Sequence, residues 1–86
     1  MDILYSEQFL KSASRLPLKL RQRLGEHLEL LKGSPFHPKL HTKHLSGDLA
    51  GLLSFRVTRD WRVTFRFIDA RTIHVMRVAN RKDIYR

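Results

Sequence analysis

The chain has 86 residues, enough for one small domain that buries only about 60% of the surface exposed by its unfolded chain. Seventeen Lys and Arg residues against eight Asp and Glu residues give a formal net charge of +9, which points to an anionic partner such as nucleic acid or an acidic protein. The absence of cysteine excludes a disulfide framework, a thiolate nucleophile and a cysteine zinc site. No apolar run approaches a membrane span and no signal-peptide pattern is present, so we expect a cytoplasmic protein, a single domain over residues 1–86 and no membrane partner.

The first half of the chain predicts a short strand followed by two helices. The apolar run at residues 2–5 is typical of a strand, and Ser6 is a typical N-cap for a helix that ends near Ser14. Residues 17–32 predict a second, amphipathic helix with Pro17 in its first turn and Gly33 as its C-cap. Its leucines recur at helical spacing and are expected in the core: Leu18, Leu20, Leu24, Leu28 and Leu31.

The second half predicts a long loop and an antiparallel meander. Residues 34–48 contain two prolines and a glycine, and a loop of this length is commonly functional. Beyond the loop the hydrophobic period changes to two, which predicts strands near residues 53–58, 62–68 and 72–78. A connection of odd length, such as residues 58–60, places Phe55 opposite Val63 and Arg56 opposite Arg62. Two facing arginines repel each other, and an anionic phosphate between them would relieve that repulsion.

The same half concentrates side chains that bind a phosphodiester and move its protons. Residues 36–48 contain three histidines and two lysines, and the chain ends in the segment NRKDIYR at residues 80–86. Histidine, arginine and tyrosine together point towards RNA. The spacing of His37, His41 and His44 would suit a metal only on a helix, which the nearby prolines oppose, so we expect no metal site. His74 lies within a strand and is expected to be a half-buried structural residue.

Three segments carry a resemblance to a known family. LSGDLAG at residues 45–51, RVTRDWRV at residues 56–63 and the terminal NRKDIYR resemble, in order and separation, the RelE/ParE superfamily of bacterial type II toxins, and within it the RelE/YafQ-like mRNA interferases. The resemblance spans essentially the whole chain. It implies an α+β fold in which a short N-terminal strand and a two-helix hairpin pack on a C-terminal antiparallel meander and leave a basic concave face.

The resemblance also implies an activity and partners. A toxin of this kind is held inactive by a cognate antitoxin in a hetero-oligomer and, once released, cleaves messenger RNA on the ribosome. The ribose 2′-hydroxyl attacks the adjacent phosphorus, so the enzyme must remove one proton, stabilise the phosphorane and protonate the departing 5′-oxygen. Neither a metal nor another cofactor is implied.

Six residues match catalytic positions of the family. Arg62 matches the phosphate-binding arginine, His44 matches a catalytic histidine of the YafQ-like branch, and Tyr85 matches the C-terminal aromatic, a general acid or a stacking platform. Asp60 falls on the hairpin aspartate and is equally a turn residue. Arg56 and Arg81 stand where YafQ-like members carry histidines, and arginine keeps its proton, so both stabilise charge without carrying protons. Alternatives remain open: a solvated Arg62, a bystander His44 and a Tyr85 packed on the sheet edge.

Further residues are candidates for RNA binding, and three functions remain open. The binding candidates are Lys39, His41, Lys43, Arg59, Trp61 and Lys82, with Trp61 alternatively a hairpin anchor. His44 together with Arg62, Arg81 and Tyr85 favours the nuclease. A ParE-like inhibitor of DNA gyrase shares the fold, and a catalytically silent protein that binds an antitoxin or its operon would explain the missing histidines at positions 56 and 81.

Overall fold

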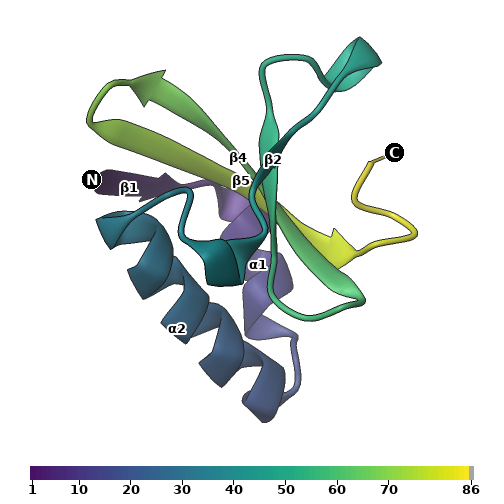
Figure 1. Cartoon of the computed structure of the whole chain (residues 1–86). Helices are drawn as coiled ribbons and strands as arrows, with labels where there is room; N and C mark the ends of the chain where they lie inside the picture. The colour runs from purple at the N-terminus through teal and green to yellow at the C-terminus, as the bar shows by residue number, and fades with distance from the viewer. Residues whose placement is uncertain (86) are drawn as a thin grey trace.

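The computed structural model describes residues 1–85 and confirms the expected α+β fold (Figure 1). The regular elements are β1 (Asp2–Tyr5), α1 (Glu7–Ser14), α2 (Leu18–Gly33), β2 (Lys43–His44), β3 (Leu53–Arg56), β4 (Trp61–Asp69) and β5 (Thr72–Asn80). Two short 3-10 helices, η1 (Pro38–Leu40) and η2 (Gly47–Leu49), flank β2. The segment predicted as one loop over residues 34–48 therefore contains η1, β2 and the first two residues of η2.

The strands form one sheet in the order β1-β5-β4-β3-β2. β1 pairs with β5 in parallel, and the other neighbours are antiparallel. The predicted register is confirmed, because Phe55 lies opposite Val63 and Arg56 lies opposite Arg62. The connection between β3 and β4, residues 57–60, is closed by the carbonyl of Trp61, which accepts hydrogen bonds from the amides of Val57 at 2.9 Å and Thr58 at 3.3 Å.

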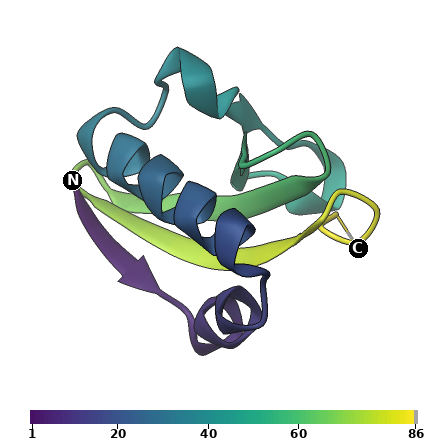
Figure 2. The same cartoon turned by 90° about the horizontal axis from the view of Figure 1, so that it is seen from below.

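The pairing sorts the side chains into two faces. Residues opposite each other in neighbouring strands point to the same side of a sheet. One side, the helix face, carries the apolar core residues of the strands: Leu53, Phe55, Val63, Phe65, Ile73 and Val75. The other side, the basic face, carries Ser54, Arg56, Arg62 and Thr64. α2 crosses the helix face (Figure 2), and its Leu24 and Leu31 belong to the same core.

The first helix begins as predicted. Ser6 is its N-cap, and the side-chain oxygen accepts a hydrogen bond from the amide of Phe9 at 3.0 Å. The same hydroxyl donates to the carbonyl of Met76 at 2.6 Å. This pair of bonds fixes the start of α1 against β5.

Two expectations for the second helix are wrong. Leu18 is 61% exposed, whereas Leu24 and Leu31 form a buried stripe along the helix. Leu18 lies six residues before Leu24, and at about 100° per residue this separation turns its side chain about 120° away from that stripe. His27 takes a place on that stripe instead and is 9% exposed. Gly33 is not a left-handed cap, since it is the last helical residue and Ser34 follows in an extended conformation with φ −155°.

Two other features concern β5 and the helices as a whole. His74 is half-buried in β5, as predicted. Within residues 1–85, no helix is both long enough and apolar enough to cross a membrane.

Candidate active site

A row of polar side chains crosses four strands on the basic face. Lys43 of β2 lies opposite Ser54 of β3, Ser54 lies opposite Thr64 of β4, and Thr64 lies opposite Arg77 of β5. Ser54 and Thr64 are buried, whereas Lys43 at the end of the row is exposed. The row therefore places the buried hydroxyl groups of Ser54 and Thr64 beside the ammonium group of Lys43 on the edge strand β2.

Beside this row stands a pair of facing arginines. Arg56 and Arg62 are direct cross-strand neighbours, whose Cβ atoms in such a pair lie about 5 Å apart. The Nε atoms of both are buried, and neither has a hydrogen-bond partner within residues 1–85. One Nη of Arg62 donates to the carbonyl of Arg59 at 3.2 Å, which holds the guanidinium near the hairpin. Two guanidinium groups with unused donors on one face form a site for an anion with several oxygen atoms.

The C-terminal segment, residues 81–85, folds back over the basic face and places the side chain of Tyr85 there. The carbonyl of Asn80 accepts hydrogen bonds from the amides of Asp83 at 2.8 Å and Ile84 at 3.0 Å, which turns the chain. Ile84 is 3% exposed, and its carbonyl accepts a bond from Arg77 at 3.5 Å. These contacts anchor the segment immediately before Tyr85.

Tyr85 links the segment to the polar row. Its hydroxyl lies 3.2 Å from the hydroxyl oxygen of Ser54, and either atom can donate. The Nζ of Lys43 lies over the Tyr85 ring, 5.3 Å from its centroid, within the range of a cation–π contact. A phenol, an ammonium group and two guanidinium groups thus share one face of the sheet.

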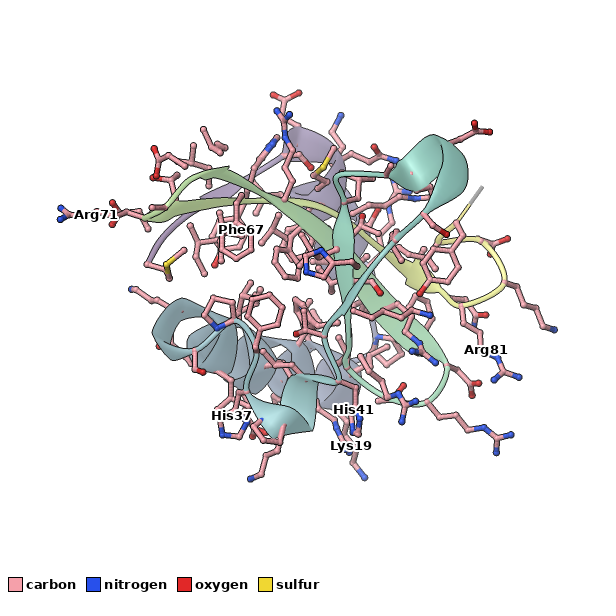
Figure 3. All side chains as sticks on the ribbon, turned by 45° about the horizontal axis from the view of Figure 1, so that its top comes forward. Lys19, His37, His41, Phe67, Arg71 and Arg81 are labelled. Atoms are coloured by element: carbon pink, nitrogen blue, oxygen red, sulfur yellow. The ribbon has the colours of Figure 1, made fainter. Side chains whose placement is uncertain are left out.

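Asp60 and Arg81 form an ion pair with each other at the rim of this face. The Nε of Arg81 lies 3.7 Å from a carboxylate oxygen of Asp60, and the Arg81 amide donates to the Asp60 carbonyl at 2.7 Å. The two side chains are 48% and 59% exposed, and Arg81 points away from the sheet (Figure 3). An exposed ion pair contributes at most about 1 kcal/mol. The contact ties the hairpin between β3 and β4 to the start of the C-terminal segment.

His44 does not lie with the other catalytic candidates. It pairs with Leu53, whose side chain is in the core, so the histidine is on the helix face. Its ring lies 6.0 Å from the ring of Phe36. Lys43 precedes it on the same strand and points to the basic face, as alternation requires. The sheet therefore separates His44 from Arg62 and Tyr85.

The RNA-binding candidates are dispersed. Lys43 joins the site, and exposed Arg59 sits at the hairpin tip, where its carbonyl holds Arg62. Trp61 is half-buried and packs against the core, in agreement with a hairpin anchor. Lys82 is exposed on the C-terminal turn. The last two candidates, Lys39 and His41, line a groove beside α2.

Sequence reasoning missed the contribution of Ser54, Thr64 and Arg77 to the site. A bulge in β5 explains the case of Arg77: Val75 lies opposite Phe65 and Arg77 lies opposite Thr64, so Met76 is an extra residue. Strict alternation from Val75 would have placed Arg77 in the core. In the part of the chain that the structure describes, no three His, Asp or Glu side chains come together in a way that could hold a metal ion.

Comparison with protein-family models and with curated proteins gives no match for this sequence. Solved structures match its fold over nearly the whole chain. A YoeB/ParE toxin from Agrobacterium tumefaciens superimposes with a TM-score of 0.80 at 19% sequence identity, covering 93% of this chain and 98% of that chain. YafQ from E. coli strain BL21(DE3) gives a TM-score of 0.78 at 21% identity, covering 99% and 98%.

A third solved structure is the RelB–RelE antitoxin–toxin complex from Methanococcus jannaschii. Its matching chain gives a TM-score of 0.75 at 25% identity, covering 95% of this chain and 94% of that chain. The three matches agree in length and architecture with the elements described above. The fold implied by the sequence motifs is thereby confirmed.

Proposed function

We propose that this chain, which has the fold of the RelE/ParE superfamily of toxins, is the toxin of a type II toxin–antitoxin pair and a ribosome-dependent endoribonuclease that cleaves messenger RNA. The observation that carries the proposal is the facing pair Arg56 and Arg62, with buried and unused Nε donors, beside Lys43 and Tyr85. This arrangement combines phosphate recognition with groups that exchange protons.

The arginine pair binds the scissile phosphate. Attack of the 2′-hydroxyl on phosphorus forms a phosphorane, and its breakdown leaves a cyclic 2′,3′-phosphate and a free 5′-hydroxyl. Negative charge on the non-bridging oxygen atoms increases along this path, so donors already fixed in place stabilise the transition state more than the ground state. Arg56 and Arg62 are held on neighbouring strands, which keeps both guanidinium groups on the same face of the sheet.

Lys43 and Tyr85 carry the protons. One proton must leave the 2′-oxygen and another must reach the departing 5′-oxygen. Arg56 and Arg62 cannot exchange protons, because a guanidinium group remains protonated in proteins. Lys43 and Tyr85 are the neighbouring groups with exchangeable protons, and Ser54 holds the phenol in place. In this scheme one of the two, in its deprotonated form, accepts the first proton, and the other, in its protonated form, donates the second.

An antitoxin covers the basic face in the inactive state. The M. jannaschii structure is a complex of antitoxin and toxin, and the formal charge of +9 on the present chain calls for an acidic partner. Binding over Arg56, Arg62 and Tyr85 would both neutralise the charge and exclude RNA. We infer a toxin–antitoxin hetero-oligomer on this basis.

The test is induced expression in bacteria followed by mapping of messenger RNA 5′ ends. The chain and Arg71→Ala, an exposed arginine at the far end of the sheet from Arg81 (Figure 3), should arrest growth and create new ends in translated regions. Arg62→Ala should create none. Growth arrest without new ends would instead indicate another target, such as gyrase, and the absence of both effects would indicate a silent binding protein.

A further inference from the structure

A groove lies between α2 and η1, beside the helix face of the sheet. It has a volume of about 740 Å³, and its polar lining residues include Lys19, Arg23, Glu26, His27, Lys39 and His41. Lys19 and His41 lie together at one edge of the molecule, whereas Arg81, at the rim of the basic face, lies elsewhere (Figure 3). The groove is thus distinct from the site of the proposed RNA cleavage.

The side chains that line this groove carry a net positive charge. Three cations, Lys19, Arg23 and Lys39, surround one carboxylate, Glu26, and none of these cations forms an ion pair within residues 1–85. Like charges gathered around one cavity raise the free energy of the folded chain, and an anion in the cavity lowers it. The groove therefore favours an anionic ligand.

His27 adds a fixed imidazole to the groove. Its Nδ1 lies 2.8 Å from the carbonyl oxygen of Arg23, which can only accept, so Nδ1 carries a proton. The ring is stacked on Phe55, with centroids 6.5 Å apart and planes 9° apart. Nε2 has no hydrogen-bond partner in the described residues, yet it is not among the fully buried atoms. Nε2 is therefore an unused hydrogen-bonding atom held at a fixed position in the groove.

The opposite wall is built by η1. Leu40 is fully buried and anchors this turn in the core. The next residue, His41, has a φ of 49°, a left-handed conformation that costs about 1 kcal/mol or more for a residue other than glycine. This backbone places His41 on the groove beside Lys19 and Arg23. Both walls are therefore fixed without a ligand.

We propose that the groove between α2 and η1 binds a phosphate group, through the charges of Lys19, Arg23 and Lys39 and hydrogen bonds with His27 and His41. A phosphate fits the lining better than an amphipathic peptide does, because Leu30 is the single apolar side chain among the lining residues in the described part of the chain. Fixed donors converging with several cations match the oxygen atoms of a phosphate. The ligand is a phosphodiester of RNA or a free phosphate, and the two share this chemistry.

Nuclear magnetic resonance of the labelled full chain tests the proposal residue by residue. Inorganic phosphate, a short 2′-O-methyl RNA that cannot be cleaved, and an acidic peptide of glutamates are titrated separately at fixed salt. Shifts of the His27 and His41 signals with phosphate, with RNA or with both support the groove, and the pattern identifies the source of the phosphate. Because each residue is followed by its own signal, phosphate bound at Arg62 is distinguished from phosphate bound in the groove.

Variants of the exposed lysines provide the control. Lys19→Gln combined with Lys39→Gln should lower the affinity read at His27 and His41 by about tenfold, because each lost cation weakens a charge-assisted contact. Lys11→Gln, on the exposed surface of α1 outside the groove, should leave it unchanged. The proposal is overturned if neither phosphate nor RNA moves these signals, if only the acidic peptide does, or if the Lys11 variant weakens binding equally.

Discussion

Lys43 lies over the ring of Tyr85, with its Nζ 5.3 Å from the ring centroid, although the two residues come from β2 and from the end of the chain. The contact depends on three other features of the fold: the pairing of Lys43 with Ser54, the turn closed at Asn80, and the burial of Ile84. It brings two groups with exchangeable protons together beside Arg56 and Arg62, as the proposed cleavage requires.

Replacing Tyr85 with Phe removes the hydroxyl group and keeps the aromatic ring, so it tests the two roles of this side chain separately. The variant keeps the contact with Lys43 but loses the hydroxyl next to Ser54. We expect the rate of cleavage on programmed ribosomes to fall by about 100-fold or more, as for the loss of a general acid or base. Ser54→Ala retains the phenol but loses its holding partner, and should cost less. A Tyr85→Phe variant with the full rate would limit Tyr85 to stacking and assign proton transfer elsewhere.

The arginine pair should affect stability and activity in opposite directions. Arg62→Gln keeps most of the aliphatic stem and removes the charge facing Arg56. We expect the free energy of unfolding in urea to stay equal or to rise by about 0.5 kcal/mol, because a like-charge cross-strand pair is relieved. Cleavage should fall by about 100-fold, because phosphorane stabilisation is lost. A variant that loses stability and activity together would indicate a structural role for Arg62.

His44 should be dispensable for proton transfer, because it lies on the helix face next to Phe36. His44→Gln is expected to leave the cleavage rate within about twofold and to keep the shape of its pH dependence, since a proton carrier must reach the reacting atoms. The profile is measured beside that of Lys43→Gln, the adjacent residue on the basic face, which should change. Loss of a limb near neutral pH in the His44 variant would show that this side chain reaches the substrate.

The sequence was sufficient to predict the fold and, within the site, the pairing of Arg56 with Arg62. Alternation and an odd connection length fixed Arg56 opposite Arg62, because register leaves no freedom once one face of the sheet is buried. The contact of Lys43 with Tyr85 had no comparable signal. β2 is two residues long and lies in a segment rich in proline, and the position of Tyr85 depends on a turn after the last strand. The bulge at Met76 likewise moved Arg77 to the basic face in a way that periodicity does not reveal.

Asp69 should contribute a pH-dependent part of the stability of the turn between β4 and β5. The amide of Arg71 donates to its carboxylate at 2.8 Å, and this bond, with further bonds from Thr72, lowers the pKa of Asp69 below its ordinary value of 3.8. A lowered folded-state pKa gives stability that is present above the unfolded-state pKa and is lost as the pH falls through the folded-state pKa. We therefore expect Asp69→Asn, which keeps a neutral acceptor, to be less stable than the parent chain in urea at pH 7. The difference should shrink towards zero as the pH is lowered below 3.8. A difference that does not change with pH would mean that the charge of Asp69 has no part in holding the turn.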